Sequence, residues 1–106
     1  MRSLEEFLNQ YDVTDSFKEL VKARQANGMA YHQERGSTWE GWKGDRFVEE
    51  AVKEALDLPV WLWKAVEHVP QLIPFIPDLI EQCSTFTIGC ECLGYDDCVE
   101  RASEYP

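Results

Sequence analysis

The stretch 45–83 constrains the fold most, because it is the most apolar part of the chain and holds four of its five prolines. In its first half, apolar residues recur with the 3.6-residue period of an amphipathic helix. They are Phe47, Val48, Ala51, Val52, Ala55 and Leu56. Pro59 suits the first turn of a helix, and Pro70 cannot continue one. The sequence therefore predicts two helices that meet just before Pro59, as a tight helical hairpin core over 45–69.

The residues before this core predict two more helices. Ser3 and Glu6 have the spacing of a capping box at the start of a short helix. A second helix of about three turns is expected to be capped by Thr14, Asp15 or Ser16 and to end at Asn27-Gly28, because glycine commonly ends a helix.

The residues after the core predict two short helices and one strand. Pro74 or Pro77 is placed to open a third helix, and Asp96 to cap a last one. Between them, apolar and polar residues alternate over 85–93, which is typical of a strand with one buried face. This strand either pairs with 29–42, read as a hairpin or a structured loop, or leaves its edge free. We therefore expect a mainly α fold of the α+β class with a small β element.

Length and charge limit the function classes. A chain of 106 residues is expected to form one compact domain, 1–106. Its 20 acidic and 10 basic residues give a net charge of −10, which disfavours direct binding to nucleic acid or to anionic membranes and favours a basic protein partner. The start of the chain has no apolar run of signal-peptide length, so we expect a cytoplasmic protein.

The acidic residues are concentrated toward the C-terminus. Residues 65–106 contain eight acids and one base, Arg101. We predict that these acids form the partner-binding surface: Glu67, Asp78, Glu81, Glu91, Asp96, Asp97, Glu100 and Glu104. Trp61 and Trp63 are further candidates, because side chains two positions apart on a helix cannot both face the core, and exposed tryptophan is frequent in binding hot spots.

The four cysteines are Cys83, Cys90, Cys92 and Cys98. Four thiolates can close a tetrahedral zinc site, but the Cys-x2-Cys knuckles of most structural zinc sites are missing. The spacing favours thiols buried as small apolar groups, with a zinc site and a disulfide or redox role as alternatives. We therefore expect no cofactor.

No catalytic pattern stands out in the sequence. The chain has no Gly-x-Ser-x-Gly elbow, Walker A loop or dinucleotide-binding fingerprint, so we expect a protein that is not an enzyme. In size, acidity and lack of catalytic motifs it is similar to phage-encoded inhibitors of bacterial defence, including anti-CRISPR and anti-restriction proteins.

That similarity leads to one main functional hypothesis and two alternatives. The main hypothesis is an interaction protein that binds, and thereby inhibits, a basic nucleic-acid-binding partner, its carboxylates mimicking phosphate. One alternative is a structural or adaptor subunit that forms a homodimer or a larger assembly. The other is a zinc-stabilised binding module.

Overall fold

The computed structural model describes residues 3–34 and 39–104, which are mostly helical and contain no strand. The chain divides into two compact units, Met1–Glu40 and Gly41–Pro106. The prediction of a mainly α fold is confirmed, and the predicted small β element is wrong. The expectation of one compact domain stays a prediction.

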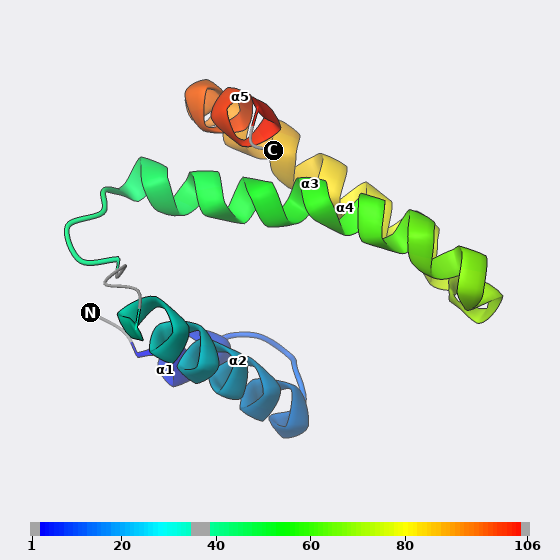
Figure 1. The fold of residues 1–106 in the computed structure, drawn as a ribbon, viewed down its shortest axis with the longest axis horizontal. Coiled ribbons are helices and arrows are strands. Elements are labelled where there is room, and N and C mark those ends of the chain that lie inside the picture. Colours follow the sequence, from blue (N-terminus) through cyan, green and yellow to red (C-terminus); the bar gives the residue numbers. More distant parts are fainter. Residues whose placement is uncertain (1–2, 35–38, 105–106) are drawn as a thin grey trace. The chain divides into compact units, whose positions relative to one another are not determined.

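The first unit contains two helices whose starts are set by hydroxyl side chains. Helix α1 spans Leu4–Leu8 and α2 spans Asp15–Glu34, and the two helices contact each other (Figure 1). The Ser3 and Thr14 hydroxyls each accept a hydrogen bond, at 3.1 Å, from the backbone N–H three residues later. Both helix starts predicted from capping residues are therefore confirmed.

Helix α2 is longer than predicted, because Gly28 does not end it. A glycine stops a helix when it adopts a left-handed conformation, and Gly28 does not have a positive φ. Residues 29–34 are thus helical and not one side of a β hairpin, and 39–42 are not extended into a strand. The middle of the predicted hairpin or loop, at 35–38, lies outside the described residues.

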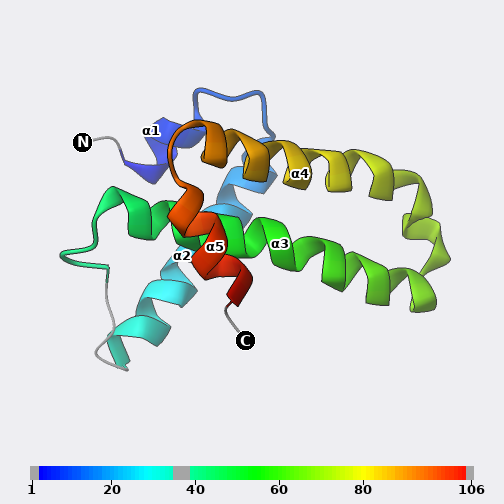
Figure 2. The same cartoon turned by 90° about the horizontal axis from the view of Figure 1, so that it is seen from above.

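The second unit is built on a hairpin of two long antiparallel helices (Figure 2). Helix α3 spans Gly44–His68, the 3₁₀ helix η1 spans Pro70–Phe75, and α4 spans Ile76–Cys92. The chain reverses in η1, so the end of α3 before Pro70 is confirmed. The predicted hairpin within 45–69 is wrong, because α3 is continuous through Pro59.

Packing explains why Pro59 does not break α3. A proline inside a helix costs about 3 kcal/mol or more. The half-buried positions of α3 continue past it with unbroken helical spacing, at Leu56, Leu62 and Val66. Contact of this stripe with η1 and α4 offsets the lost backbone bond, since tertiary packing supplies most helix stability.

The segment predicted as a strand forms the second half of α4. Thr87 and Cys90 within it, together with Cys83 just before it, are half-buried or buried side chains at helical spacing, whereas Phe86 and Ile88, expected to point inward, are exposed. The Thr87 hydroxyl donates a hydrogen bond of 3.0 Å to the carbonyl of Cys83, so this β-favouring residue is satisfied within the helix.

Gly94 ends α4 in a Schellman motif. Its φ is +91°, its N–H donates to the carbonyl of Glu91, and the N–H of Tyr95 donates to that of Cys90, both at 3.0 Å. The chain then turns into the last helix, α5, which spans Asp96–Glu104, so the short last helix predicted to begin at Asp96 is confirmed.

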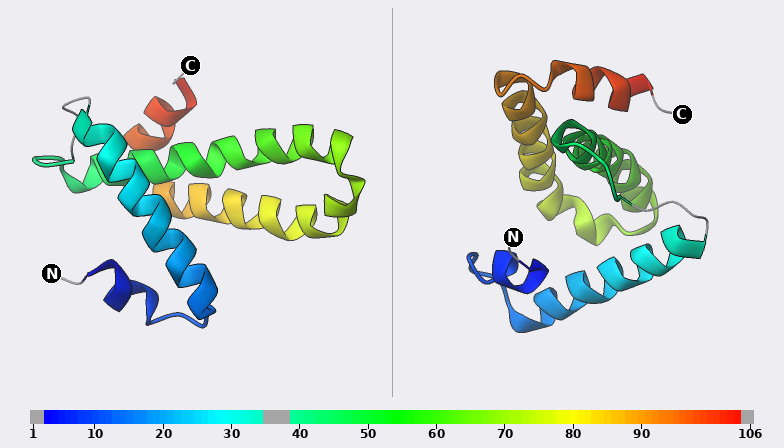
Figure 3. Two further views of the ribbon diagram at one scale, coloured as in Figure 1. Left: turned by 60° about the horizontal axis from the view of Figure 1, so that its bottom comes forward. Right: turned by 90° about the vertical axis from the view of Figure 1, so that its left-hand side faces the viewer.

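Helix α5 packs on α3 and α4 at the end of the hairpin that lies away from η1 (Figures 2 and 3). One buried residue from each helix forms the centre of the core: Val52, Cys90 and Ala102. Val48, Leu56, Tyr95 and Val99 pack around them. The well-packed core of this unit therefore lies at its α5 end.

A buried carboxylate joins α5 to α3. Glu49 is only 3% exposed, and its carboxylate accepts hydrogen bonds from Arg101 Nε and, at 2.8 Å, from Arg46 Nη1. The ammonium of Lys53 lies 3.8 Å away. Arg101 also lies 3.7 Å from Asp45, so the one base of residues 65–106 is fixed to the start of α3.

Two glycine substitutions test α4 and its end. Gly89 lies inside the helix with open space around it, so Gly89→Ala should raise the free energy of unfolding by about 0.5–1 kcal/mol. Gly94→Ala should lower it by about 1 kcal/mol or more, because alanine is strained at positive φ. Urea unfolding monitored by circular dichroism measures both changes, and a loss of stability in Gly89→Ala would contradict a helix there.

The Glu49 interaction predicts a loss of stability in acid. The hydrogen bond from Arg101 lowers the pKa of Glu49 below its ordinary 4.5, although burial acts the other way. This contribution is complete above pH 4.5 and is lost as the pH falls through the lower pKa of the folded state. Glu49→Gln should cost about 1–3 kcal/mol at neutral pH and flatten the acid dependence.

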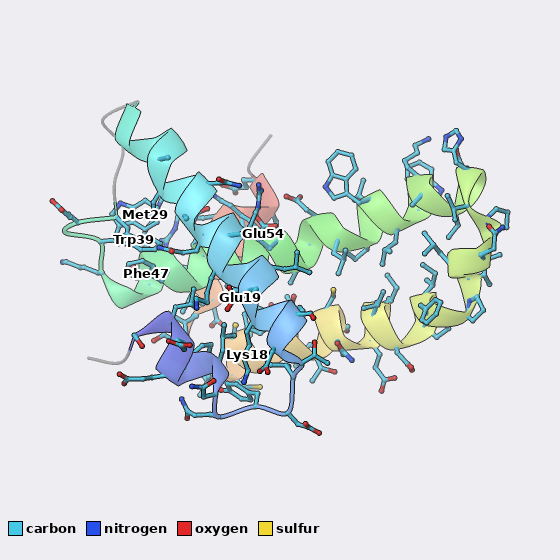
Figure 4. All side chains as sticks on the ribbon, turned by 90° about the horizontal axis from the view of Figure 1, so that it is seen from below. Lys18, Glu19, Met29, Trp39, Phe47 and Glu54 are labelled. Atoms are coloured by element: carbon cyan, nitrogen blue, oxygen red, sulfur yellow. The ribbon has the colours of Figure 1, made fainter. Side chains whose placement is uncertain are left out.

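The matched control is Glu54→Gln, on the same helix. Glu54, labelled in Figure 4, is exposed, and no ion pair joins it to a described residue. Urea unfolding at a series of pH values should show that the free energy of unfolding of this control falls as the pH falls, and that of Glu49→Gln falls less steeply. Equal slopes would mean that Glu49 does not supply the acid-sensitive stability.

Candidate functional site

All eight acids predicted to bind a partner are exposed. The carboxylate of Glu67 lies 3.7 Å from the ammonium of Lys64. The other seven form no ion pair with any residue that the structure describes. Most of the negative charge in this set is therefore directed to solvent without a counter-ion from the described chain.

Four of these acids share one face of α5. Asp96, Asp97, Glu100 and Glu104 fall within an arc of about 100° at 3.6 residues per turn. The buried residues Cys98 and Ala102 lie outside this arc. We call these four acids the α5 acidic face.

The structure separates the predicted acids into two groups. Glu67, Asp78 and Glu81 lie on α3 and α4 near η1, whereas Glu91 lies at the other end of α4, next to α5. Asp78 and Glu91 are about 20 Å apart along the helix at 1.5 Å per residue. The sequence suggested one acidic surface, and the structure places its members at both ends of the hairpin.

Trp61 and Trp63 are both exposed, by 71% and 60%. This confirms the prediction that at least one of them lies outside the core. The Lys64 ammonium lies 4.2 Å from the centre of the Trp63 ring, in a cation–π arrangement. The role of Trp61 and Trp63 in binding a partner stays a prediction.

An apolar groove runs between α3 and the η1–α4 segment, at the end of the hairpin away from α5. Its volume is about 680 Å³. Figure 4 shows side chains of both helices projecting into the space between them. Its lining residues, which define the distal groove, are Pro59, Leu62, Trp63, Val66, Ile73, Ile76, Pro77, Ile80 and Glu81. A smaller depression, lined by Asp78, Glu81, Gln82 and Thr85, shares Glu81 with it.

The four cysteines have different environments. Cys90 and Cys98 are buried, Cys83 is half-buried and Cys92 is exposed, and all four are free thiols. Burial, together with the neighbouring Cys98, raises the pKa of Cys90. The Cys98 thiol donates a hydrogen bond of 3.0 Å to the Asp45 carbonyl. Among the side chains that the structure describes, in 3–30 and 39–104, no three histidine, cysteine or acidic residues are grouped to hold a metal ion.

Two features were missed in the sequence. One is the pairing of Glu49 with Arg101. The sequence held two indications of it: Glu49 is an acid on the apolar stripe of α3, three residues before Val52, and Arg101 is the lone base of the C-terminal third. The distal groove was hidden by the assumption that the chain turns back at Pro59. Once α3 continues, Pro59, Leu62, Trp63 and Val66 form one stripe at helical spacing.

Comparisons of the chain with models of protein families, with curated proteins and with solved structures find no match in any of the three. Among the described helices, none combines the length and the apolar character needed to span a bilayer.

Thiol labelling at mildly alkaline pH tests the cysteine environments. Cys92 should react first because it is exposed, and Cys90 should react only on unfolding because burial protects the thiol and disfavours the thiolate. Mass spectrometry of the labelled peptides measures the order. In a Cys92→Ser control the fast phase should disappear, and rapid labelling of Cys90 in the folded chain would contradict its buried position.

Proposed function

We propose that the chain is a protein-binding domain that takes up a Lys- and Arg-rich surface of a partner protein through its exposed acids. The observation that supports this most is the α5 acidic face, where four carboxylates share one side of a helix and have no counter-ion among the described residues. Opposite charge on the partner would supply the missing counter-ions, steer the encounter and select against acidic proteins.

The partner class that fits such a surface is a nucleic-acid-binding protein. Its basic groove is built to meet closely spaced phosphates, so carboxylates held on a rigid helix can replace part of that charge. Binding of this kind excludes nucleic acid and inhibits the partner, in the manner of a phage-encoded anti-CRISPR mimic. A cytoplasmic location would bring the chain together with such partners.

The exposed tryptophans favour a second candidate, a subunit of a homo-oligomer or larger assembly. Trp61 and Trp63 offer large apolar area, and association through them would be insensitive to salt because burial of apolar surface is not screened. The strand edge at 85–93 does not contribute to this candidate, since that segment is helical.

Charge reversal on α5 tests the proposed function. Glu100→Lys with Glu104→Lys alters the later part of the α5 acidic face and spares Asp96 and Asp97, whose charges favour the helix start. This variant should lose most of the partner protein captured by the wild-type chain from nuclease-treated lysate. The captured partner should elute as salt rises and should be displaced by added duplex DNA.

The control for this test carries the same charge change elsewhere. Glu54→Lys with Asp57→Lys alters two exposed positions of α3 that are not in the predicted set, and it should keep the partner. Circular dichroism must show that both variants are folded. An equal loss of captured partner in the two variants would mean that only the net charge of the chain matters, which would contradict a binding role for the α5 acidic face. Salt-resistant association of the chain with its own copies would instead support the assembly subunit.

A further inference from the structure

We infer that the distal groove binds one amphipathic helical segment of the partner, with apolar residues along one face and Lys or Arg beside them. This inference rests on the proposed function and assigns to it a docking site separate from the α5 acidic face.

The spacing of the lining residues fits a helix. On the α3 side the stripe has members at i, i+3, i+4 and i+7, beginning at Pro59, and the η1–α4 side repeats that spacing beginning at Ile73. The α3 stripe covers about 10 Å, or two helical turns. A partner helix that presents anchors at i, i+3, i+4 and i+7 covers the same length.

The groove is open, and its apolar residues are only partly covered. Trp63 is 60% exposed and Ile73 is 58% exposed, so contact with a partner would remove further apolar area from water. Aromatic residues in such a groove commonly supply the largest share of the binding energy. Helix α5 packs at the other end of the hairpin, and no described helix of the second unit covers this groove.

The charge at the groove identifies the occupant. Glu81 lies in the lining, and Asp78 lies beside it in the adjoining depression. Lys64, next to Trp63, is paired with Glu67. A second copy of the chain would bring the same acidic rim against this one, and an anionic membrane would also be repelled, whereas Lys or Arg flanking an apolar helix face would be attracted.

Synthetic helices test the inference with the full chain. One peptide of about 18 residues carries leucines on one face and lysines on the other, and its counterpart replaces every lysine with glutamate; this length spans several turns. Fluorescence anisotropy of the labelled peptides should show binding of the Leu/Lys helix and much weaker binding of the Leu/Glu helix.

Matched variants locate the binding site. Ile73→Asp should weaken binding of the Leu/Lys helix about tenfold or more. Ile88→Asp should change it less than about twofold, because Ile88 is 56% exposed but lies outside the groove. Glu81→Lys should weaken binding more than Glu91→Lys, which makes the same charge change on the same helix. Since Glu81 is exposed, Glu81→Lys also keeps the test valid if Ile73→Asp does not fold.

Four outcomes would overturn the inference. The first is an equal loss of Leu/Lys-helix binding in Ile73→Asp and Ile88→Asp, and the second is equal binding of the two peptides. The third is self-association of the chain that Ile73→Asp abolishes, and the fourth is binding of the chain to phosphatidylcholine vesicles that Ile73→Asp abolishes. The inference and the proposed function can fail separately. If the natural partner is lost with the α5 variant but kept by Ile73→Asp and Glu81→Lys, the proposed function stands and the groove is not its docking site.

Discussion

The buried carboxylate of Glu49 is the interaction on which the arrangement of the second unit depends. A charge removed from water is tolerated only if other groups replace its hydration, and here Arg101, Arg46 and Lys53 surround it. Because Arg101 comes from α5 and the other two bases come from α3, this requirement fixes one helix on the other. The adjacent bond from Cys98 to the Asp45 carbonyl joins the same two helices.

Because most basic side chains of the second unit are paired with Glu49 or Glu67, the remaining charge on its surface is negative. Three of the five bases in 41–106 surround Glu49, and a fourth, Lys64, is paired with Glu67. The acids of α5 and α4 therefore face solvent with no counter-ion among the described residues. Surface charge of this kind adds little to stability, but it strongly affects the choice of partner and the rate of encounter.

The same arrangement leaves the two ends of the hairpin different. At one end α5 covers Val52 and Cys90, whereas at the other α3 and α4 continue with only η1 between them. Apolar side chains remain exposed there, including Trp63 and Ile73. A chain that leaves such apolar area exposed next to acids with no counter-ion among the described residues has the features of a binding surface.

The sequence predicted those elements whose signals are local. Ser3 identified the start of α1 and Asp96 that of α5, because a side chain there bonds or favours the first turn of its own helix. Pro70 likewise marked the end of α3. Such signals do not depend on what the helix later packs against.

The predictions that failed depended on long-range packing. The alternation around Thr87 favours a strand in isolation, and the ring of Pro59 disfavours a helix interior, yet both segments are helical where α3 and α4 contact each other. The candidate acids were identified one by one, but their division between two ends of a hairpin could not be inferred while the hairpin was assigned to the wrong residues. Glu49 and Arg101 are 52 positions apart, so only the fold brings them together.

Amide hydrogen exchange across 41–106 tests most directly the claim that the unit is packed at its α5 end and uncovered at its distal end. We expect the slowest exchange at amides near Val52, Cys90 and Cys98, and clearly faster exchange within α3 and α4 around Trp63 and Ile80. Equally slow exchange at both ends in the isolated chain would contradict this arrangement, because it would require a cover over the distal groove.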